Sequence, residues 1–119
     1  MATLTRQNIV EAGLTPTFAA CAGGGDVVDN SDGKTFLHVK NGSGGSLTVT
    51  IAAGVAATGI ADPKFGTLNK TAVAKVVGAG AEAVIGPFKK HGFNNASEQL
   101  AITYSGVTSL TIAAYKIDY

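Results

Sequence analysis

The chain has 119 residues, which suits a single domain with one hydrophobic core. Hydrophobic residues make up 45% of it and charged residues only 14%, which argues against a disordered chain and leaves a largely neutral surface. The formal net charge is +1, without a long basic run, so we expect neither nucleic acid nor a membrane among its partners.

We predict one β domain over residues 1–119, in which residues 1–17 form a short N-terminal helix or arm. Thr5 suits the start of a helix, apolar residues at positions 9, 10 and 14 give a partial stripe, and Gly13 suits a helix end. Pro16 then favours extended chain. Residues 23–26 are expected to be a flexible loop and residues 30–33 a turn.

From residue 36 onward, apolar and polar residues alternate with the period of a β-strand. Two pairs of segments predict hairpins, namely 36–40 with 47–51 and 72–77 with 82–85. Two last strands are expected at 100–104 and 110–115. The connection over 52–70 is predicted to be a surface excursion, and 89–98 a polar loop anchored by Phe88 and Phe93.

Six strands joined by glycine turns predict an all-β fold: an antiparallel β-sandwich or barrel, jelly-roll-like, with the short N-terminal helix or arm. The pattern leaves jelly roll, Greek-key sandwich and barrel open.

Candidate chemistry along the chain is sparse. Residues 76–83 imitate the Gly-x-Gly-x-x-Ala fingerprint of dinucleotide binding, but Gly86 and Pro87 end the following segment before a helix can form. The single cysteine, Cys21, excludes an internal disulfide and is expected to be a buried packing residue. His38 and His91 lie on separate elements, which does not suggest a metal site. We therefore expect no catalytic residue, no metal and no cofactor, and predict that the protein is not an enzyme.

Four segments carry a wider likeness that covers nearly the whole chain except 52–70 and 89–98. They are 8–18, which contains NIVEAGL and PTF, 33–42 (GKTFLHVKNG), 84–88 (VIGPF) and 102–114 (ITYSGVTSLTIAA). Together they resemble the capsid decoration, or cement, proteins of tailed bacteriophages. These are fold-pattern motifs, so the resemblance transfers no individual functional residue.

The resemblance implies a virion structural protein that binds the outer surface of the major capsid protein shell and stabilises it, as a homotrimer. It implies synthesis in the host cytoplasm, which agrees with a start that lacks the pattern of a signal peptide. Residues 2–13 are our candidate contacting arm, and the alternative is that they close one end of the sandwich. The candidate capsid or subunit contacts are Leu4, Arg6, Ile9, Val10, Leu14 and Phe18.

Two other functions remain open. One is a different phage structural component, such as a tail tube, a head–tail connector or a fibre base. The other is a carbohydrate-binding β-sandwich, whose aromatic platform would have to come from Tyr104, Tyr115 and Tyr119, since the chain has no tryptophan.

Overall fold

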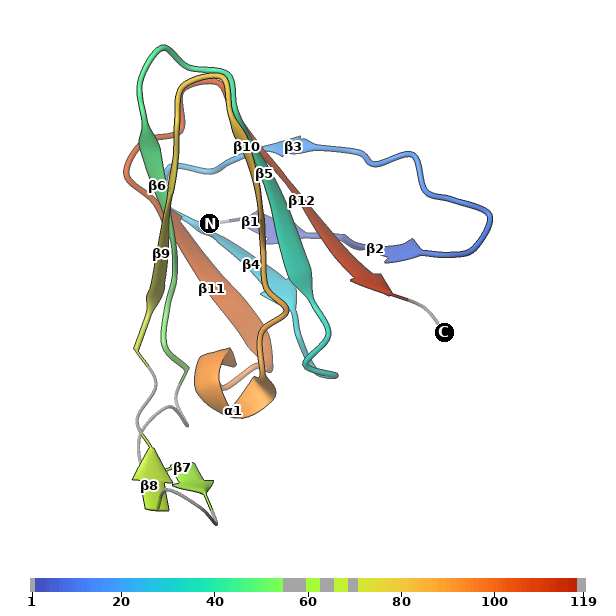
Figure 1. Cartoon of the computed structure of the whole chain (residues 1–119), viewed down its shortest axis with the longest axis vertical. Helices are drawn as coiled ribbons and strands as arrows, with labels where there is room; N and C mark the ends of the chain where they lie inside the picture. Colours follow the sequence, from blue (N-terminus) through green and yellow to red (C-terminus); the bar gives the residue numbers. More distant parts are fainter. Residues whose placement is uncertain (1, 55–59, 63–65, 69–70, 118–119) are drawn as a thin grey trace.

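Figure 1 shows the computed structural model, which describes residues 2–54, 60–62, 66–68 and 71–117. Two mixed β-sheets pack face to face, and a small separate pair, β7–β8, lies beyond one end. In chain order the elements are β1 (Ala2–Leu4), β2 (Arg6–Ile9), β3 (Ala19–Ala20), β4 (Asp26–Asp29), β5 (Phe36–Asn41), β6 (Leu47–Ile51), β7 (Ile60–Asp62), β8 (Gly66–Leu68), β9 (Val73–Val77), β10 (Glu82–Ile85), α1 (Lys90–Phe93), β11 (Gln99–Tyr104) and β12 (Leu110–Ile117).

The strands divide into two sheets. Sheet A has the order β1-β4-β11-β6-β9, and sheet B has the order β10-β5-β12-β2, with β3 also paired to β12. Alternate side chains of the central strands point between the sheets and are at most 1% exposed: Leu37, Val39, Val49, Ile51, Leu100, Ile102, Leu110 and Ile112. Each such burial contributes about 1.5–3 kcal/mol to folding. The prediction of an all-β sandwich is confirmed, and the sheets do not close into a barrel.

All six strands predicted from residue 36 onward are present, but neither predicted hairpin is. β5 lies in sheet B and β6 in sheet A, and β9 and β10 are divided in the same way. β6 pairs instead with β9 and β11, and β5 with β10 and β12, all antiparallel. The buried Asn41 explains the first crossing, because its Nδ2 donates to the carbonyls of Gly45 (2.8 Å) and Val77 (2.9 Å) and so holds the chain at the corner between the sheets.

The prediction of an N-terminal helix is wrong, because this segment forms the strands β1 and β2. β1 pairs in parallel with β4, and β2 pairs in parallel with β12, while Thr5 lies where the chain passes from sheet A to sheet B. The unpaired edges of β4 and β12 offer hydrogen bonds that a short, weakly helical segment cannot match by itself. The loop expected at 23–26 is also shorter than predicted, because Asp26 begins β4. The N-terminal residues therefore close one side of the sandwich.

The connection between β10 and β11 contains α1, a single helical turn. Phe88 and Phe93 anchor it as predicted: they are 3% and 9% exposed and meet edge to face with ring centroids 5.1 Å apart. The predicted excursion over 52–70 is described only at 52–54, β7 and β8, and the remainder of that prediction lies outside the described residues.

Candidate interface on the outer face of sheet B

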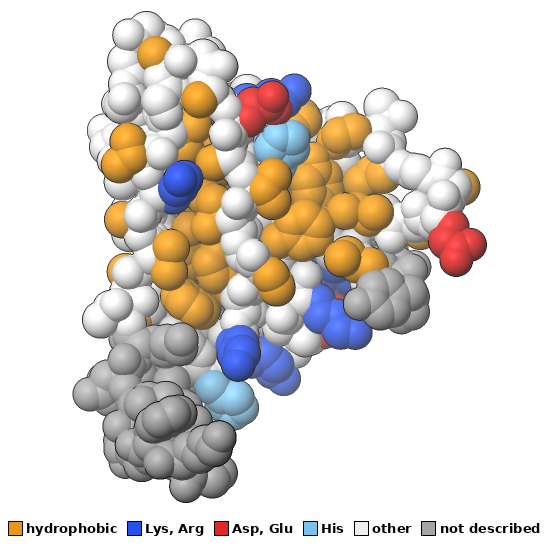
Figure 2. All heavy atoms as spheres, in the orientation of Figure 1, with side chains coloured by type: hydrophobic (Ala, Val, Ile, Leu, Met, Phe, Trp, Pro, Cys, Tyr) orange, Lys and Arg blue, Asp and Glu red, His pale blue; other side chains and the backbone are white. Residues whose placement is uncertain are grey.

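The side chains of sheet B that point away from the core form a continuous, partly apolar surface. The register places Val84 of β10 beside His38 of β5, Phe36 of β5 beside Tyr115 of β12, and Ile117 of β12 beside Ile9 of β2. We call these six residues the outer face of sheet B. Figure 2 shows hydrophobic side chains gathered over β5 and β12 on this side of the molecule.

This surface holds an unusual share of the exposed apolar side chains. Four large aliphatic residues of the described chain are exposed, and three of them lie here or next to it: Val84 (66%), Ile117 (47%) and Val10 (41%), which directly follows Ile9. The fourth, Val76 (59%), lies on β9 in sheet A. Isolated exposed valines are ordinary, but a contiguous apolar surface is typical of a contact with another molecule.

An ordered polar cluster lies in the middle of this face. His38 Nε2 is 2.9 Å from Glu82 Oε1, and His38 Nδ1 is 3.1 Å from the Tyr115 hydroxyl. Burial, together with the charge of Glu82, raises the pKa of Tyr115, so its phenol stays protonated and can donate to Nδ1. Nε2 can donate to Glu82 while Nδ1 bonds the Tyr115 hydroxyl, so the ring bridges the two side chains. The cluster fixes the ring in place rather than activating a nucleophile.

Phe18 covers part of the same cluster from the segment before β3. Its ring meets the His38 ring edge to face, with centroids 4.9 Å apart, and Lys40 Nζ lies 4.2 Å from the Phe18 centroid. The cation–π contact gives this side of the face a positive charge held above an aromatic ring.

A loop projects from the sandwich beside this face, between β2 and β3 (Figure 1). Its base is closed by Gln7, whose amide Nε2 donates to the Thr17 carbonyl (2.8 Å) and whose Oε1 accepts from the Thr17 N–H (3.0 Å). The Gln7 side chain thus makes the two hydrogen bonds with the Thr17 backbone that a neighbouring strand would otherwise make. The loop carries Val10, exposed, and Leu14, half-buried.

The structure divides the six candidate contact residues into two groups. Ile9, Val10, Leu14 and Phe18 lie on the outer face or in the adjoining segment 10–18. Leu4 packs against the core instead.

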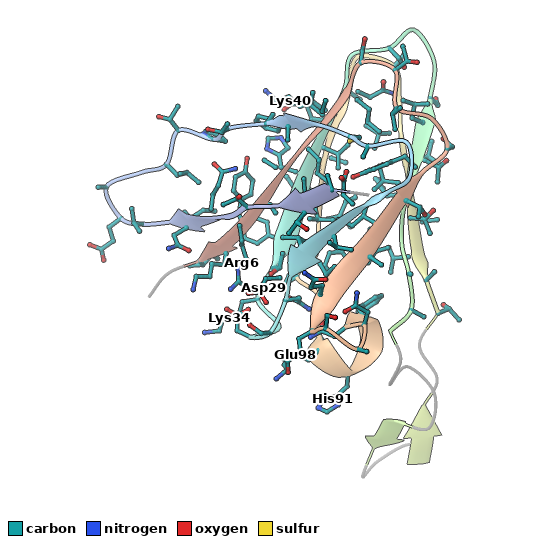
Figure 3. All side chains as sticks on the ribbon, turned by 180° about the vertical axis from the view of Figure 1, so that it is seen from behind. Arg6, Asp29, Lys34, Lys40, His91 and Glu98 are labelled. Atoms are coloured by element: carbon teal, nitrogen blue, oxygen red, sulfur yellow. The ribbon has the colours of Figure 1, made fainter. Side chains whose placement is uncertain are left out.

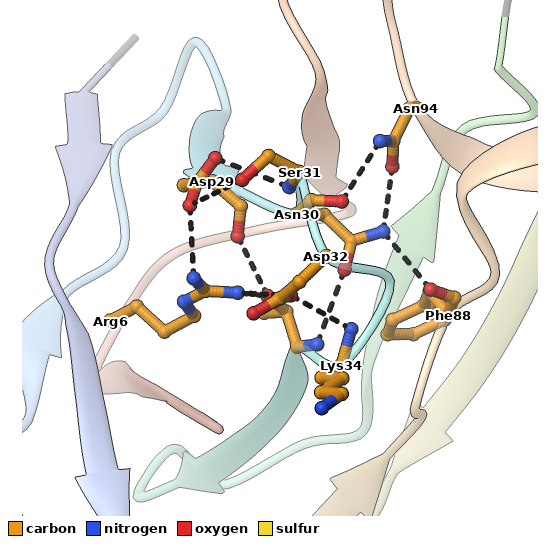
Figure 4. A network of polar contacts seen from close by, with 9 residues as sticks. Arg6, Asp29, Asn30, Ser31, Asp32, Lys34, Phe88 and Asn94 are labelled. Atoms are coloured by element: carbon orange, nitrogen blue, oxygen red, sulfur yellow. Dashed lines mark hydrogen bonds and ion pairs between the residues drawn. The ribbon is translucent and has the colours of Figure 1, made fainter. Parts of the chain in front are cut away.

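Arg6 also serves the fold. Its side chain is only 13% exposed and forms ion pairs with Asp29 (3.0 Å) and Asp32 (2.6 Å), which Figure 4 marks. Figure 3 shows Arg6 of β2 beside Asp29 of β4. Partial burial opposes ionisation of Asp32, but the hydrogen bonds from Arg6 and the Lys34 N–H outweigh it and lower the pKa of that carboxyl. Arg6 thereby ties β2 to the turn after β4.

A second network joins this turn to the segment before β11 (Figure 4). Asn30, fully buried, donates from Nδ2 to the Phe88 carbonyl (3.0 Å) and to Asn94 Oδ1 (2.6 Å), and its Oδ1 accepts from the Thr35 N–H (3.2 Å). Asn94 returns a bond from its Nδ2 to the Asn30 carbonyl (2.9 Å). In the sequence Asn30 indicates only a turn, because its partners are 58 and 64 residues away.

Close packing continues at Gly86, just before Phe88. Its φ is +118°, and a Cβ there would lie 2.9 Å from Phe36 Cβ and 3.0 Å from Phe36 Cα. Only glycine fits between the outer face and the Phe88 ring at this point.

At the other end of the core lies a buried polar group of three residues. The Tyr104 hydroxyl donates to Asp26 Oδ2 (2.6 Å), which also accepts from the Ala22 N–H (3.2 Å), while Asp26 Oδ1 has no partner in the described part of the chain. Burial raises the pKa of the Cys21 thiol to about 11; a hydrogen bond with Tyr104 opposes this, and the Asp26 charge adds to it. A thiol with that pKa is a poor nucleophile at neutral pH.

Cys21 is therefore expected to resist alkylation by iodoacetamide in the folded protein at mildly alkaline pH, and to react rapidly in concentrated guanidinium chloride. Mass spectrometry of the quenched reaction gives the extent of modification with time. Equal rates in the two conditions would contradict a buried, protonated thiol. This prediction tests the packing role expected for Cys21.

The larger cavity, about 440 Å³, opens between the β1–β2 segment and β12. Its described lining consists of alanines of β1, β3 and β12 with Leu4, Ile112, Gln7 and threonines, which offer no acid, base or thiol. Within the described residues, no three of His, Cys, Asp and Glu come together as metal ligands. No described helix has the length and apolarity needed to span a bilayer.

Comparison of the chain with protein-family models, with curated proteins and with solved structures found no match.

Proposed function

We propose that this protein is a capsid decoration (cement) protein that binds, as a homotrimer, to the outer surface of a shell of major capsid protein and stabilises the shell. The observation that carries the proposal is the outer face of sheet B, where exposed Val84 and Ile117 accompany the half-buried Phe36 and His38 rings. Exposed apolar side chains around an ordered polar cluster suit a protein–protein contact, which combines apolar and hydrogen-bonding groups. The low charge of the whole chain agrees with extensive contact to other subunits.

Stabilisation then follows from linkage. A protein that binds assembled shell subunits and not separated ones adds its binding free energy to the stability of the shell. A contribution of a few kcal/mol per copy suffices, because symmetry repeats the same contact over the whole particle. The protein itself performs no chemistry in this role; it supplies a rigid surface.

Two of the three tyrosines considered for sugar binding are poorly placed for it, and Tyr119 lies outside the described residues. Tyr115 is only 5% exposed, and the Tyr104 hydroxyl is bound to the buried Asp26. Neither ring is free to form the flat, solvent-exposed platform that carbohydrate binding needs. A tail tube, connector or fibre base would use the same face for a different partner.

The decisive experiment mixes the purified protein with expanded, undecorated capsids and with unexpanded procapsids, and pellets the particles. We expect saturable co-sedimentation with expanded shells and a higher temperature of shell disruption. Absence of binding to both kinds of shell would contradict the proposal and direct the search to tail components.

The same assay tests which face binds. Val84→Asp is expected to lower shell affinity at least about tenfold, or about 1.4 kcal/mol, because it places a charge in an apolar contact. Val76→Asp is the matched control, since Val76 is equally exposed aliphatic surface on sheet A and its replacement is expected to leave binding unchanged. Equal effects of the two variants would contradict the assignment of the outer face of sheet B.

A further inference from the structure

A small pocket opens at the end of the outer face nearest α1. Its volume is about 190 Å³, and it is lined by Gly33, Lys34, Phe36, Pro87 and Ile117. Pockets for small-molecule ligands usually measure about 300–1,000 Å³. This one has room for a single apolar side chain, and two of its walls, Phe36 and Ile117, belong to the outer face itself.

Exposed lysines lie at this pocket and on the segment that follows its wall. Lys34 lines the pocket, and Lys89 and Lys90 follow Pro87 at the start of α1. Lys90 lies against the turn that carries Lys34, because a Cβ added at Gly33 would be 3.1 Å from Lys90 Cγ. Figure 2 shows basic side chains next to hydrophobic ones toward this end of the molecule.

The positive charge of these lysines is not neutralised by the described carboxylates. The ion pairs of the described chain involve Arg6, His38 and Lys40, and not Lys34, Lys89 or Lys90. Asp32, two residues before Lys34, is already bound by Arg6. Among the described residues, a ligand that reaches the pocket therefore meets Lys34 beside an apolar floor, with Lys89 and Lys90 on the neighbouring segment.

The pocket is also held rigid. Its two rims are the turn at 30–34 and the segment 86–90, and the buried Asn30 joins them through bonds to Phe88 and Asn94. A preformed site binds without the cost of ordering its loops, which favours affinity.

We propose that this pocket receives one apolar side chain of an acidic segment of the shell protein, whose carboxylates meet Lys34, Lys89 and Lys90. The inference rests on the proposed function and names the partner chemistry at its site. Charge complementarity selects the partner: lysines at and next to an apolar pocket match an acidic segment with an apolar anchor. Nucleic acid would call for basic residues along a groove, and the whole chain carries a net charge of only +1.

The test measures co-sedimentation with expanded shells for Lys34→Glu and Lys90→Glu, with Lys75→Glu on the edge strand β9 as the matched control for charge reversal. We expect wild-type binding to weaken with added salt, and each of the first two variants to bind about tenfold more weakly. Lys75→Glu is expected to stay within about twofold of wild type. Thermal unfolding of each variant confirms that the fold is intact.

A second measurement identifies the partner. A carbodiimide joins lysine amines to carboxylates in direct contact, so treatment of decorated shells is expected to link Lys34, Lys89 or Lys90 to an Asp or Glu of the shell protein near an apolar residue. Peptide mass spectrometry locates the linked residues.

The outcomes separate the two proposals. If the wild type binds shells but Lys34→Glu and Lys90→Glu bind equally well, or the crosslinks fall elsewhere, the acidic-segment inference is overturned while the decoration role stands. Failure of the wild type to bind any shell overturns both. Binding of duplex DNA that these lysine variants abolish, with shell binding unaffected, would replace the acidic protein segment by nucleic acid.

Discussion

A chain that lacks residues 2–13 is expected to lose its cooperative fold rather than only its partner. The deletion removes β1 and β2, which pair with β4 and β12, and with them Leu4, which packs against the core. It also removes Arg6, which leaves Thr35, Asp29 and Asp32 without the guanidinium that binds them. The combined loss is comparable with the total stability of a small domain, about 5–15 kcal/mol. Circular dichroism during heating should show no sharp transition.

A matched control separates the strands from the loop that follows them. Replacing residues 10–16 by a short glycine–serine turn keeps β1 and β2 and removes only chain that projects from the sandwich. This variant should unfold cooperatively close to the wild-type temperature, since changes of loop length cost little. A folded 2–13 deletion that fails to bind shells would instead support a separate contacting arm.

Replacing Asn30 by alanine is expected to cost about 3–5 kcal/mol of stability. The change leaves the Phe88 carbonyl, Asn94 Oδ1 and the Thr35 N–H without the partner that Asn30 provides, and each buried group left unbonded costs about 1–3 kcal/mol. The amide also links the turn at 30–34 to the segment before β11, so both rims of the small pocket loosen. Denaturant unfolding followed by fluorescence or circular dichroism measures the loss.

Asn8→Ala provides the comparison for this variant, because Asn8 is an exposed asparagine on β2. Its replacement should change the stability by less than about 0.5 kcal/mol. If Asn30→Ala proved as mild as Asn8→Ala, the network drawn in Figure 4 would not bridge the two segments.

The sequence predicts those strands in which apolar and polar residues alternate. The six strands from 36 onward show the period of two because one face of each packs into the core, and their predicted bounds agree with the structure to within one or two residues. The alternation does not indicate which of these strands pair with each other. A glycine-rich connection suits a hairpin and a crossing between sheets equally well, and here the long-range bonds of Asn41 select the crossing.

The two short N-terminal strands also cannot be predicted from the local sequence. β1 and β2 have three and four residues, too few for a period to show. They are strands because β4 and β12 present open edges, which only the folded chain creates.

The sequence predicts only some residues of the candidate interface. Four predicted contacts lie on or beside the outer face of sheet B: Ile9, Val10, Leu14 and Phe18. The sequence does not indicate Val84 and Ile117, because facing outward depends on the register of β10 and β12. Ile117 also lies beyond the predicted end of its strand, which continues to Ile117 to pair with β2.

The division of neighbouring strands between the two sheets has a kinetic consequence. β5 and β6, β9 and β10, and β11 and β12 are adjacent in sequence, yet each pair is split across the sandwich. None of these three neighbouring pairs can therefore form a local hairpin nucleus, and the antiparallel core strands that lie closest along the described chain are β6 and β9, separated by residues 52–72. Folding has to wait for encounters between distant segments, such as β4 with β11 or β5 with β12. Domains dominated by such pairings fold in milliseconds to seconds, and this one should gain protection from hydrogen exchange across both sheets in a single step.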